Sequence, residues 1–251
     1  MIYDTDLAHI HDTGFSASAG QFAAALRQIL AEAGIEQGRI LELGCGSGVT
    51  ARRLVEYGYD LVGMDISPAM IELARQRIPE AQFHVGSLWD SLIPACRCVV
   101  ALNEVLCYRA DEDDTSQLSP LFEKIFAALE PGGLFLFDVA EVGLGRDEGT
   151  TFHETPDWCC GVRFEYDARR DRLMRHITTF RRFDDSSEGS PNELYRRSHE
   201  RHVVQLFHEQ EIQTTLQKAG FDARSVRHFG QSPILPQRIG FIARKGGGLR
   251  A

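Results

Sequence analysis

The sequence lacks a long apolar run, a basic leader and an excess of positive charge. No stretch approaches the roughly 20 apolar residues that a transmembrane helix needs. The first residues, MIYDTDLAHI, hold neither a basic region nor an apolar core, so we predict no secretory signal peptide. The formal net charge of −9 disfavours binding to nucleic acids or anionic membranes, which positive surfaces promote. We therefore expect a cytoplasmic protein with neither a membrane nor a nucleic acid as its partner.

The cysteines form no C-x-x-C pair, the spacing that is common in zinc and redox sites. They are Cys45, Cys96, Cys98, Cys107, Cys159 and Cys160. Such scattered thiols favour reduced, mostly buried side chains over a disulfide framework, and we expect no metal site. The remaining composition is ordinary, because a chain of 251 residues with 43% hydrophobic residues can bury a full core.

Up to residue 140, short apolar runs alternate with segments of helical periodicity. The predicted strands are residues 39–44, 60–65, 81–86, 98–103 and 133–140. The predicted helices are residues 20–33, 49–57, 68–78 and 118–129. Ser67 followed by Pro68 is typical of a helix N-cap and first turn. Nearly continuous apolar strands that alternate with helices indicate a parallel sheet covered on both faces.

The pattern changes after residue 140. We predict a loop over 141–160, strands on both sides of the turn-like DARRD within 161–183, and an extended run over 193–207. A helix around 212–219 and strands in RSVRHFG and RIGFIARK would then complete the main sheet. The antiparallel part is therefore an insertion into an α/β domain. Between residues 161 and 201, ten arginines face eight acids, a balance that favours a solvated strand face over a nucleic-acid surface.

The segment LELGCGSG, residues 41–48, holds three glycines directly after an apolar strand. A P-loop is excluded because no Lys follows the glycines, and Val49 stands where the dinucleotide fingerprint has Gly or Ala. A ligand with a ribose but no pyrophosphate fits better. Gly44 and Gly46 would allow close approach, the helix start near Gly48 would favour a carboxylate, and Asp65 could accept hydrogen bonds from ribose hydroxyls. The alternative is a tight turn without a ligand, with Asp65 as a helix cap.

Several motifs stand in a fixed order along the chain: ELGCGSG after one strand, DISP after the next, GS after the third, NE after the fourth and LEPGG before the fifth. This set closely resembles the class I S-adenosylmethionine-dependent methyltransferases of the small-molecule type, over residues 37–140 and again over 208–245. The resemblance implies a Rossmann-like, doubly wound α/β fold with a mostly parallel seven-stranded sheet and an antiparallel last strand pair. A small antiparallel β insertion would be added to it.

The same resemblance implies S-adenosylmethionine as cofactor, S-adenosylhomocysteine as product, and a set of binding residues matched by position. The methionine portion would lie beside Glu42, Leu43, Gly44, Cys45 and Gly46; the ribose at Asp65; the adenine near Ile66, Met70, Gly86, Ser87 and Leu88; and the sulfonium near Asn103, Glu104 and Val105. Ser87 departs from the family, which often has an acidic residue there. A hydroxyl accepts a hydrogen bond from the adenine amino group more weakly than a carboxylate.

We expect four regions: an N-terminal helical lid over 1–36, the cofactor-binding core over 37–140, the insertion over 141–207 as a substrate cap, and the end of the core with a tail over 208–251. The acceptor side offers Tyr3, His11 and Tyr108 as substrate candidates. His11 is a weak candidate for a general base, and no catalytic residue is otherwise evident. In the insertion, packing is favoured over a pocket position for Trp158, Phe164, Tyr195 and His199.

The function that we expect is transfer of a methyl group to an N or O atom of a small molecule by in-line displacement. Asn103-Glu104 is not the N-P-P-Y or D-P-P-Y signature of many nucleic-acid amino-methylating enzymes, which agrees with the negative net charge. A non-catalytic cofactor-binding regulator or partner protein is the alternative. A nicotinamide oxidoreductase is a more distant one. The acceptor and the oligomeric state stay open.

Overall fold

A seven-stranded sheet forms the centre of the computed structural model, which describes residues 2–15, 19–110, 118–146, 149–183 and 194–246. The strand order is β11-β14-β6-β4-β1-β2-β3. These strands are β1 (Arg39–Leu43), β2 (Asp60–Asp65), β3 (Gln82–Val85), β4 (Cys96–Ala101), β6 (Leu129–Ala140), β11 (Phe221–Val226) and β14 (Arg238–Lys245). Only β14 runs antiparallel to its two neighbours, and all other pairs are parallel. The predicted fold class is confirmed.

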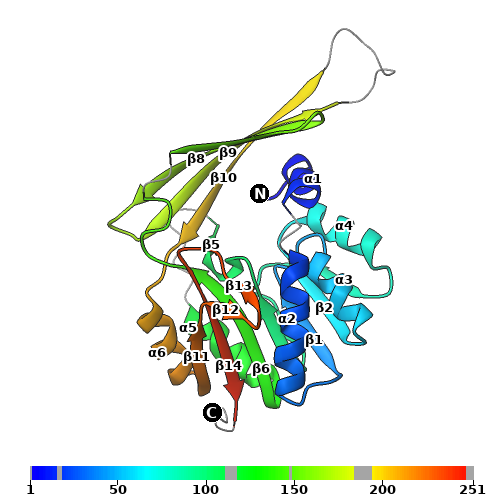
Figure 1. Ribbon diagram of the computed structural model, residues 1–251, viewed down its shortest axis with the longest axis vertical. Helices are drawn as coiled ribbons and strands as arrows, with labels where there is room; N and C mark the ends of the chain where they lie inside the picture. The colour runs from blue at the N-terminus through cyan, green and yellow to red at the C-terminus, as the bar shows by residue number, and fades with distance from the viewer. Residues whose placement is uncertain (1, 16–18, 111–117, 147–148, 184–193, 247–251) are drawn as a thin grey trace.

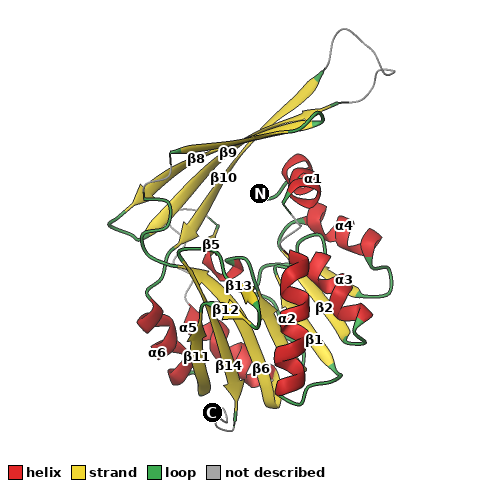
Figure 2. Cartoon of the chain, viewed as in Figure 1, coloured by secondary structure: helices red, strands yellow, loops and turns green. Residues whose placement is uncertain are grey.

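Helices cover both faces of this sheet, as Figure 2 shows. They are α2 (Ala19–Glu32), α3 (Val49–Glu56), α4 (Pro68–Arg77), α5 (Leu118–Ala128) and α6 (Glu209–Lys218). Alternate residues of a strand point to opposite faces, so Leu41 packs in the core beneath α5 and α6, whereas Ile40 packs in the core beneath α2, α3 and α4. The Oγ of Ser67 accepts the N–H of Met70 at 3.1 Å, which is the predicted N-cap of α4.

The insertion, together with the short strand β5 from the segment after β4, forms a separate antiparallel sheet in the order β5-β10-β9-β8-β7. Its strands are β5 (Tyr108–Arg109), β7 (Thr150–Glu154), β8 (Trp158–Asp167), β9 (Arg172–Arg182) and β10 (Tyr195–Gln205). Figure 1 shows the long strands β8, β9 and β10 rising above the carboxyl edge of the main sheet. The loop predicted over 141–160 is wrong in its second half, which holds β7 and the start of β8. Every residue of β7 is exposed, so this edge strand has no apolar face for a sequence pattern to reveal.

Two further differences from prediction lie at the ends of the main sheet. The strand expected in RSVRHFG instead begins earlier, as β11, and His228–Phe229 belongs to a small ribbon, β12, with β13 (Ser232–Pro233). At the N-terminus, α1 (Thr5–Gly14) precedes the first helix predicted from periodicity and lies between the insertion sheet and α4 (Figure 1). None of the helices that the structure describes is long and apolar enough to cross a bilayer.

Ion pairs attach α1 to its two neighbours. Asp6 is buried and bonds to Arg196 of β10 at 2.6 Å and to Arg181 of β9 at 3.4 Å. Asp12 accepts from Arg77 of α4 at 2.8 Å and from the hydroxyl of Ser47 in the glycine segment at 2.5 Å. Helix α1 is therefore attached to the insertion sheet on one side and to α4 and the glycine segment on the other.

Candidate functional site

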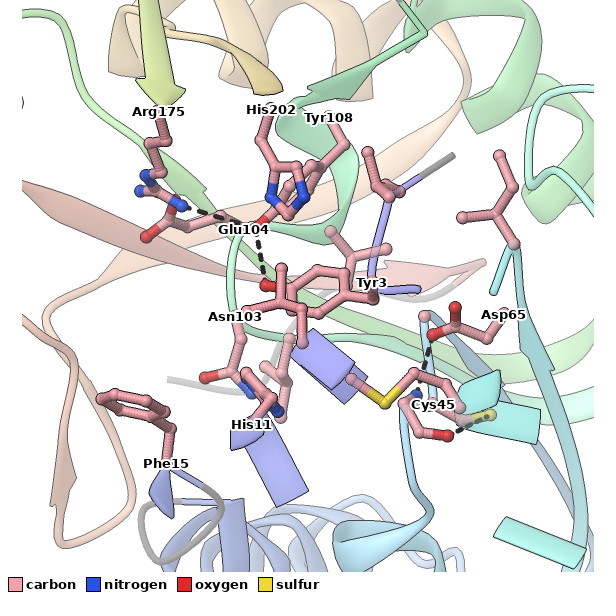
Figure 3. A pocket seen from close by; sticks show the side chains of 18 of the residues that line it. Tyr3, His11, Phe15, Cys45, Asp65, Asn103, Glu104, Tyr108, Arg175 and His202 are labelled. Atoms are coloured by element: carbon pink, nitrogen blue, oxygen red, sulfur yellow. Dashed lines mark hydrogen bonds and ion pairs between the residues drawn. The ribbon is translucent and has the colours of Figure 1, made fainter. Parts of the chain in front are cut away.

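A cavity of about 830 Å³ lies between the carboxyl edge of the main sheet, the insertion sheet and α1. Ligand pockets range over roughly 300–1,000 Å³, so this volume is at the large end and suits two ligands side by side. Its floor is formed by the segments that follow β1, β2, β3 and β4, and its roof by β8, β9 and β10. Figure 3 shows side chains from both sheets and from the N-terminal segment converging on it.

The three glycines after β1 have different roles, although all have left-handed backbones, with φ of +64° at Gly44, +53° at Gly46 and +80° at Gly48. A Cβ on Gly44 would overlap the side chain of Val105, and one on Gly48 would lie 3.3 Å from the Cβ of Ala74. A Cβ on Gly46 would meet nothing closer than 4.0 Å. Gly44 and Gly48 therefore serve packing, and Gly46 leaves open space at the cavity wall.

Asp65 fixes the shape of this wall. Its carboxylate accepts the N–H of Gly46 at 2.9 Å and the N–H of Ser67 at 2.9 Å, so it joins the segments after β1 and β2 (Figure 3). Burial raises the pKa of Asp65, while the backbone donors oppose the rise. Ile66 beside it is 47% exposed and lines the cavity, which gives an apolar surface next to a carboxylate. Such a pair suits a ribose and its attached base.

Glu42 is buried in the cavity wall, and its Oε2 has no hydrogen-bond partner among the residues that the structure describes. Burial, followed by the nearby charge of Asp65, raises the pKa of Glu42 to about 8. An unpaired buried carboxyl costs free energy until a cation or donor satisfies it. The amino group of S-adenosylmethionine is such a cation, so the residues present fit that cofactor.

The segment after β4 is strained. Asn103 and Glu104 both have left-handed backbones, with φ of +64° and +62°, which non-glycine residues rarely adopt. Asp138 of β6 stabilises them, because its carboxylate accepts the N–H of Asn103 at 2.6 Å and that of Glu104 at 3.1 Å. Burial and the charge of Glu104 raise the pKa of Asp138 to about 7. Strain of this kind often accompanies function, and here it turns the Asn103 side chain into the cavity (Figure 3).

The Glu104 side chain turns toward two arginines. Its carboxylate accepts from Arg175 of β9 at 2.7 Å and from the Nε of Arg238 at the start of β14. Burial alone would raise the pKa of Glu104, but the two guanidinium groups outweigh it and lower that pKa. Glu104, expected beside the cofactor, is thus also the link between the main sheet and the insertion.

The other predicted cofactor residues divide into two groups. Those that line the cavity are Gly44, Cys45, Gly46, Met70, Gly86, Ser87, Leu88 and Val105. Leu43 does not line it, because its side chain is buried in the core between the sheet and α5. The hydroxyl of Ser87 accepts the N–H of Trp89 at 3.2 Å, so part of its acceptor capacity is used locally.

The three substrate candidates lie together. The hydroxyls of Tyr3 and Tyr108 are 3.0 Å apart, and the rings of Tyr3 and His11 are 5.2 Å apart in an edge-on arrangement (Figure 3). Burial raises the pKa of the Tyr3 hydroxyl and lowers that of the His11 imidazole, which favours a neutral ring. All three side chains line the cavity.

The insertion residues considered from sequence mostly pack elsewhere. Of the four side chains considered, only that of Phe164 lines the cavity. Trp158 packs against Gly14 of α1, Tyr195 is 42% exposed, and His199 bonds through Nδ1 to Thr178 at 3.1 Å.

Sequence patterns missed Arg175, Arg238, His202 and Asp138. His202 is almost fully buried, with Nε2 2.9 Å from Glu200 and with Nδ1 unpartnered among the described residues. Arg175 and His202 could have been found from the alternation of side chains along a strand. Arg175 is the register partner of Phe164 on one side and of His202 on the other. Side chains in register on adjacent strands share one face of a sheet.

Tyr3 connects the insertion to the cofactor side through its backbone. Its N–H donates to Glu200 of β10 at 2.6 Å, and its carbonyl accepts from the hydroxyl of Ser67 at 2.6 Å. Glu200 also accepts the N–H of Asp4 at 2.9 Å. The first residues of the chain therefore cross the cavity between Asp65 and the insertion sheet.

Comparisons with known proteins show which family and fold this chain resembles. Residues 17–226 match the methyltransferase-domain family, which is most of the chain. Magnesium-protoporphyrin O-methyltransferase of Rhodobacter capsulatus is 37% identical over 79 residues, which cover 30% of this chain and 35% of that enzyme. The chain thus spans about a third of the length of this relative. A dTDP-3-amino-3,4,6-trideoxy-alpha-D-glucopyranose N,N-dimethyltransferase of Streptomyces venezuelae is 23% identical, over 87% of this chain and 91% of the enzyme.

Among solved structures, an S-adenosylmethionine-dependent methyltransferase from Clostridium acetobutylicum superposes with a TM-score of 0.79 at 18% identity, over 96% of this chain and 98% of that one. At this identity the likeness shows the fold. The family match shows the family, and it confirms the resemblance that the ordered motifs carried.

Proposed function

The chain belongs to the class I S-adenosylmethionine-dependent methyltransferase family, and on this premise we propose that it transfers a methyl group to an N or O atom of a small molecule. The observation that carries the proposal is the unpaired carboxyl of Glu42 beside Gly46 and Asp65, at the carboxyl edge of the sheet. When bound, S-adenosylmethionine supplies an electrophilic methyl group on a sulfonium. The protein's part is to hold the two reactants in line and away from water.

Each wall residue has a task in this proposal. Glu42 would bind the amino group and Asp65 the ribose hydroxyls, while Ile66, Met70 and the segment 86–88 would contact the adenine. Asn103 and Val105 would lie near the sulfonium. The cavity-lining positions of all these residues support this assignment.

On the acceptor side, the insertion and α1 would exclude water. His11 is a candidate to accept a proton from the attacking atom, because burial lowers its pKa and favours the neutral imidazole that a base requires. A base is needed only where the acceptor must lose a proton. The relatives include enzymes named for O-methylation and enzymes named for N-methylation, which supports either atom as the acceptor.

The six cysteines are all free in the structure, which suits the reducing cytoplasm that we propose as the location. The described residues include no group of three or more His, Cys, Asp or Glu side chains placed to bind a metal. The acceptor would be a small molecule that fits the roofed cavity.

The proposal is tested in two steps. Isothermal titration should show that S-adenosylhomocysteine binds and that NAD does not. The protein is then incubated with S-adenosylmethionine and a metabolite extract, and mass spectrometry identifies the compound that gains a methyl group. Binding without any methylated product would favour the alternative, a non-catalytic cofactor-binding regulator, whereas binding of NAD alone would overturn the family-based assignment of the site.

A further inference from the structure

The acids that line the cavity all come from the main sheet and the segments after its strands. They are Glu42, Asp65, Glu104 and Asp138, and Arg238 lines the cavity from the same side. The insertion residues that line the cavity include Arg175 and Arg201 but, among those that the structure describes, no acid. The insertion is not short of acids, since Glu165 and Asp167 lie in β8, but neither lines the cavity. The roof is therefore selectively positive within a chain of net charge −9.

Arg175 is the centre of this positive region. Its side chain is 16% exposed, its Nη2 donates to Glu104 at 2.7 Å, and its Nη1 lies 3.4 Å from the Tyr108 hydroxyl. The Tyr108 hydroxyl is in turn 3.0 Å from that of Tyr3. Only one of the two hydroxyl protons can lie between the tyrosine oxygens. The proton of the second hydroxyl can therefore point to a ligand. Guanidinium and hydroxyl donors are thus gathered at one point of the cavity wall (Figure 3).

The nearby acid does not fully balance the guanidinium charge. Among the residues that the structure describes, Glu104 is the one acid that pairs with both Arg175 and Arg238. Asp138 bonds to two backbone N–H groups rather than to an arginine, and burial keeps it only partly ionised at neutral pH, with a pKa of about 7. The excess positive charge is therefore at most one unit. It matches the single charge of a carboxylate better than that of a phosphate monoester, which carries about −1.5 to −2.

We propose that Arg175, with the hydroxyls of Tyr108 and Tyr3, binds a carboxylate of the methyl acceptor. This inference rests on the proposed methyl transfer and narrows its substrate to small organic acids. Phe164 is the register partner of Arg175 on β8 and also lines the cavity, so the acid would contact an apolar surface beside its charged group. In this proposal the acceptor's carboxylate serves for binding only. The proposal does not specify which atom of the acceptor attacks the methyl group.

The experiment uses the full chain with methyl-labelled S-adenosylmethionine. A metabolite extract is separated on an anion exchanger into retained, anionic compounds and unretained ones, and each fraction is offered as acceptor. We expect label in the retained fraction, with or without prior phosphatase treatment of the extract. Label mainly in the unretained fraction would leave methyl transfer standing and overturn the anionic acceptor. Loss of labelling after phosphatase would overturn the carboxylate in favour of a phosphate. Label in neither fraction would overturn the proposed transfer, and this inference with it.

Variants of the same chain test the residue. Arg175→Gln should lower kcat/KM for the retained acceptor by about 100-fold, mainly through KM, because a buried charge partner is lost. Arg175→Lys should restore part of this loss. Urea unfolding checks that each variant is folded, because Arg175 bonds to Glu104 on the cofactor side and cofactor affinity is therefore not an independent check. The matched control is Arg163→Gln, an exposed arginine that precedes Phe164 and pairs with Glu165 at 3.6 Å. Equal kcat/KM values for Arg175→Gln and Arg163→Gln would overturn the assignment.

Discussion

The two walls of the cavity are built in different ways. The cofactor wall comes from strand ends that follow one another along the chain, and its shape depends on backbone groups: the N–H of Gly46 and of Ser67 and the left-handed turns at the glycines. The acceptor wall joins side chains of Tyr3, Tyr108 and Arg175, which are far apart in sequence. A wall of local backbone geometry depends on the few side chains that hold the backbone, such as Asp65, whereas a wall of long-range side-chain contacts can be changed one residue at a time.

The largest effect that we expect is on the cofactor wall. Asp65→Ala removes a carboxylate that accepts two backbone N–H groups and that we assign to the ribose. Hydrogen bonds to a charged group contribute about 1.5–3 kcal/mol each, so binding of S-adenosylhomocysteine should weaken by at least about 100-fold in isothermal titration. Asp60→Ala, at the exposed start of the same strand, should leave binding unchanged. Normal affinity of Asp65→Ala would show that the ribose is bound elsewhere.

Two neighbouring glycines separate packing from ligand space. Gly44→Ala adds a Cβ against Val105 at a left-handed position, and urea unfolding should show a loss of about 3 kcal/mol from strain and overpacking together. Gly46→Ala has the strain, but its Cβ meets nothing closer than the Met70 sulfur at 4.0 Å, so it should lose only about 1 kcal/mol. It should nevertheless weaken cofactor binding. Equal losses of stability would contradict the different roles of the two glycines.

Glu42 should make the stability of the ligand-free protein depend on pH. Its pKa is about 8 in the folded state against an ordinary value of 4.5, so between these values the folded state holds a proton that the unfolded state has lost. The free energy of unfolding should then fall as pH rises through this window, by about 1.4 kcal/mol per pH unit from this group. Glu42→Gln should lack this part of the slope in denaturant titrations from pH 5 to 8. Parallel curves for the two proteins would mean that Glu42 is not buried unpaired.

The smallest effect is expected where α1 attaches to the insertion. Asp6→Asn weakens the pairs with Arg196 and Arg181, and because these arginines are partly exposed the loss should be about 1 kcal/mol in urea unfolding. Hydrogen exchange should rise in α1 and not in α3, and binding of S-adenosylhomocysteine should change little. A large loss of cofactor affinity would show that the acceptor wall and the cofactor wall are not separable.

The parts of the molecule that were predicted correctly have local causes. The run from β1 to α4 follows from apolar strands, glycine spacing and the Ser67-Pro68 cap, all of which act over a few residues. Helix α1 did not appear in the periodicity, and its anchors, Asp6 and Asp12, bond to arginines far along the chain. Strand β5 holds only two residues and exists because it pairs with β10.

The site divides in the same way. Gly44, Gly46 and Asp65 could be placed from motif order, since each stands at a fixed distance from a strand end. Arg175 and Arg238 could not, because a single charged residue in a strand carries no sign of the carboxylate that it will meet. Glu104 bonds to Arg175 across the space between the two sheets and to Arg238 at the start of β14, and both partners are far from it in the sequence. Leu43 was expected to border the cofactor. The alternation of side chains along β1 instead turns it into the core.

The insertion leaves and rejoins the main domain at almost one point. The N–H of Phe207 donates to the carbonyl of Ala140 at 2.9 Å, and the N–H of Val142 donates to the carbonyl of Phe207 at 3.2 Å. A segment whose two ends are hydrogen-bonded neighbours can be lengthened, shortened or exchanged without moving the strands that flank it. The insertion can therefore change in sequence and length independently of the main sheet, so that the same cofactor-binding core can serve different acceptors.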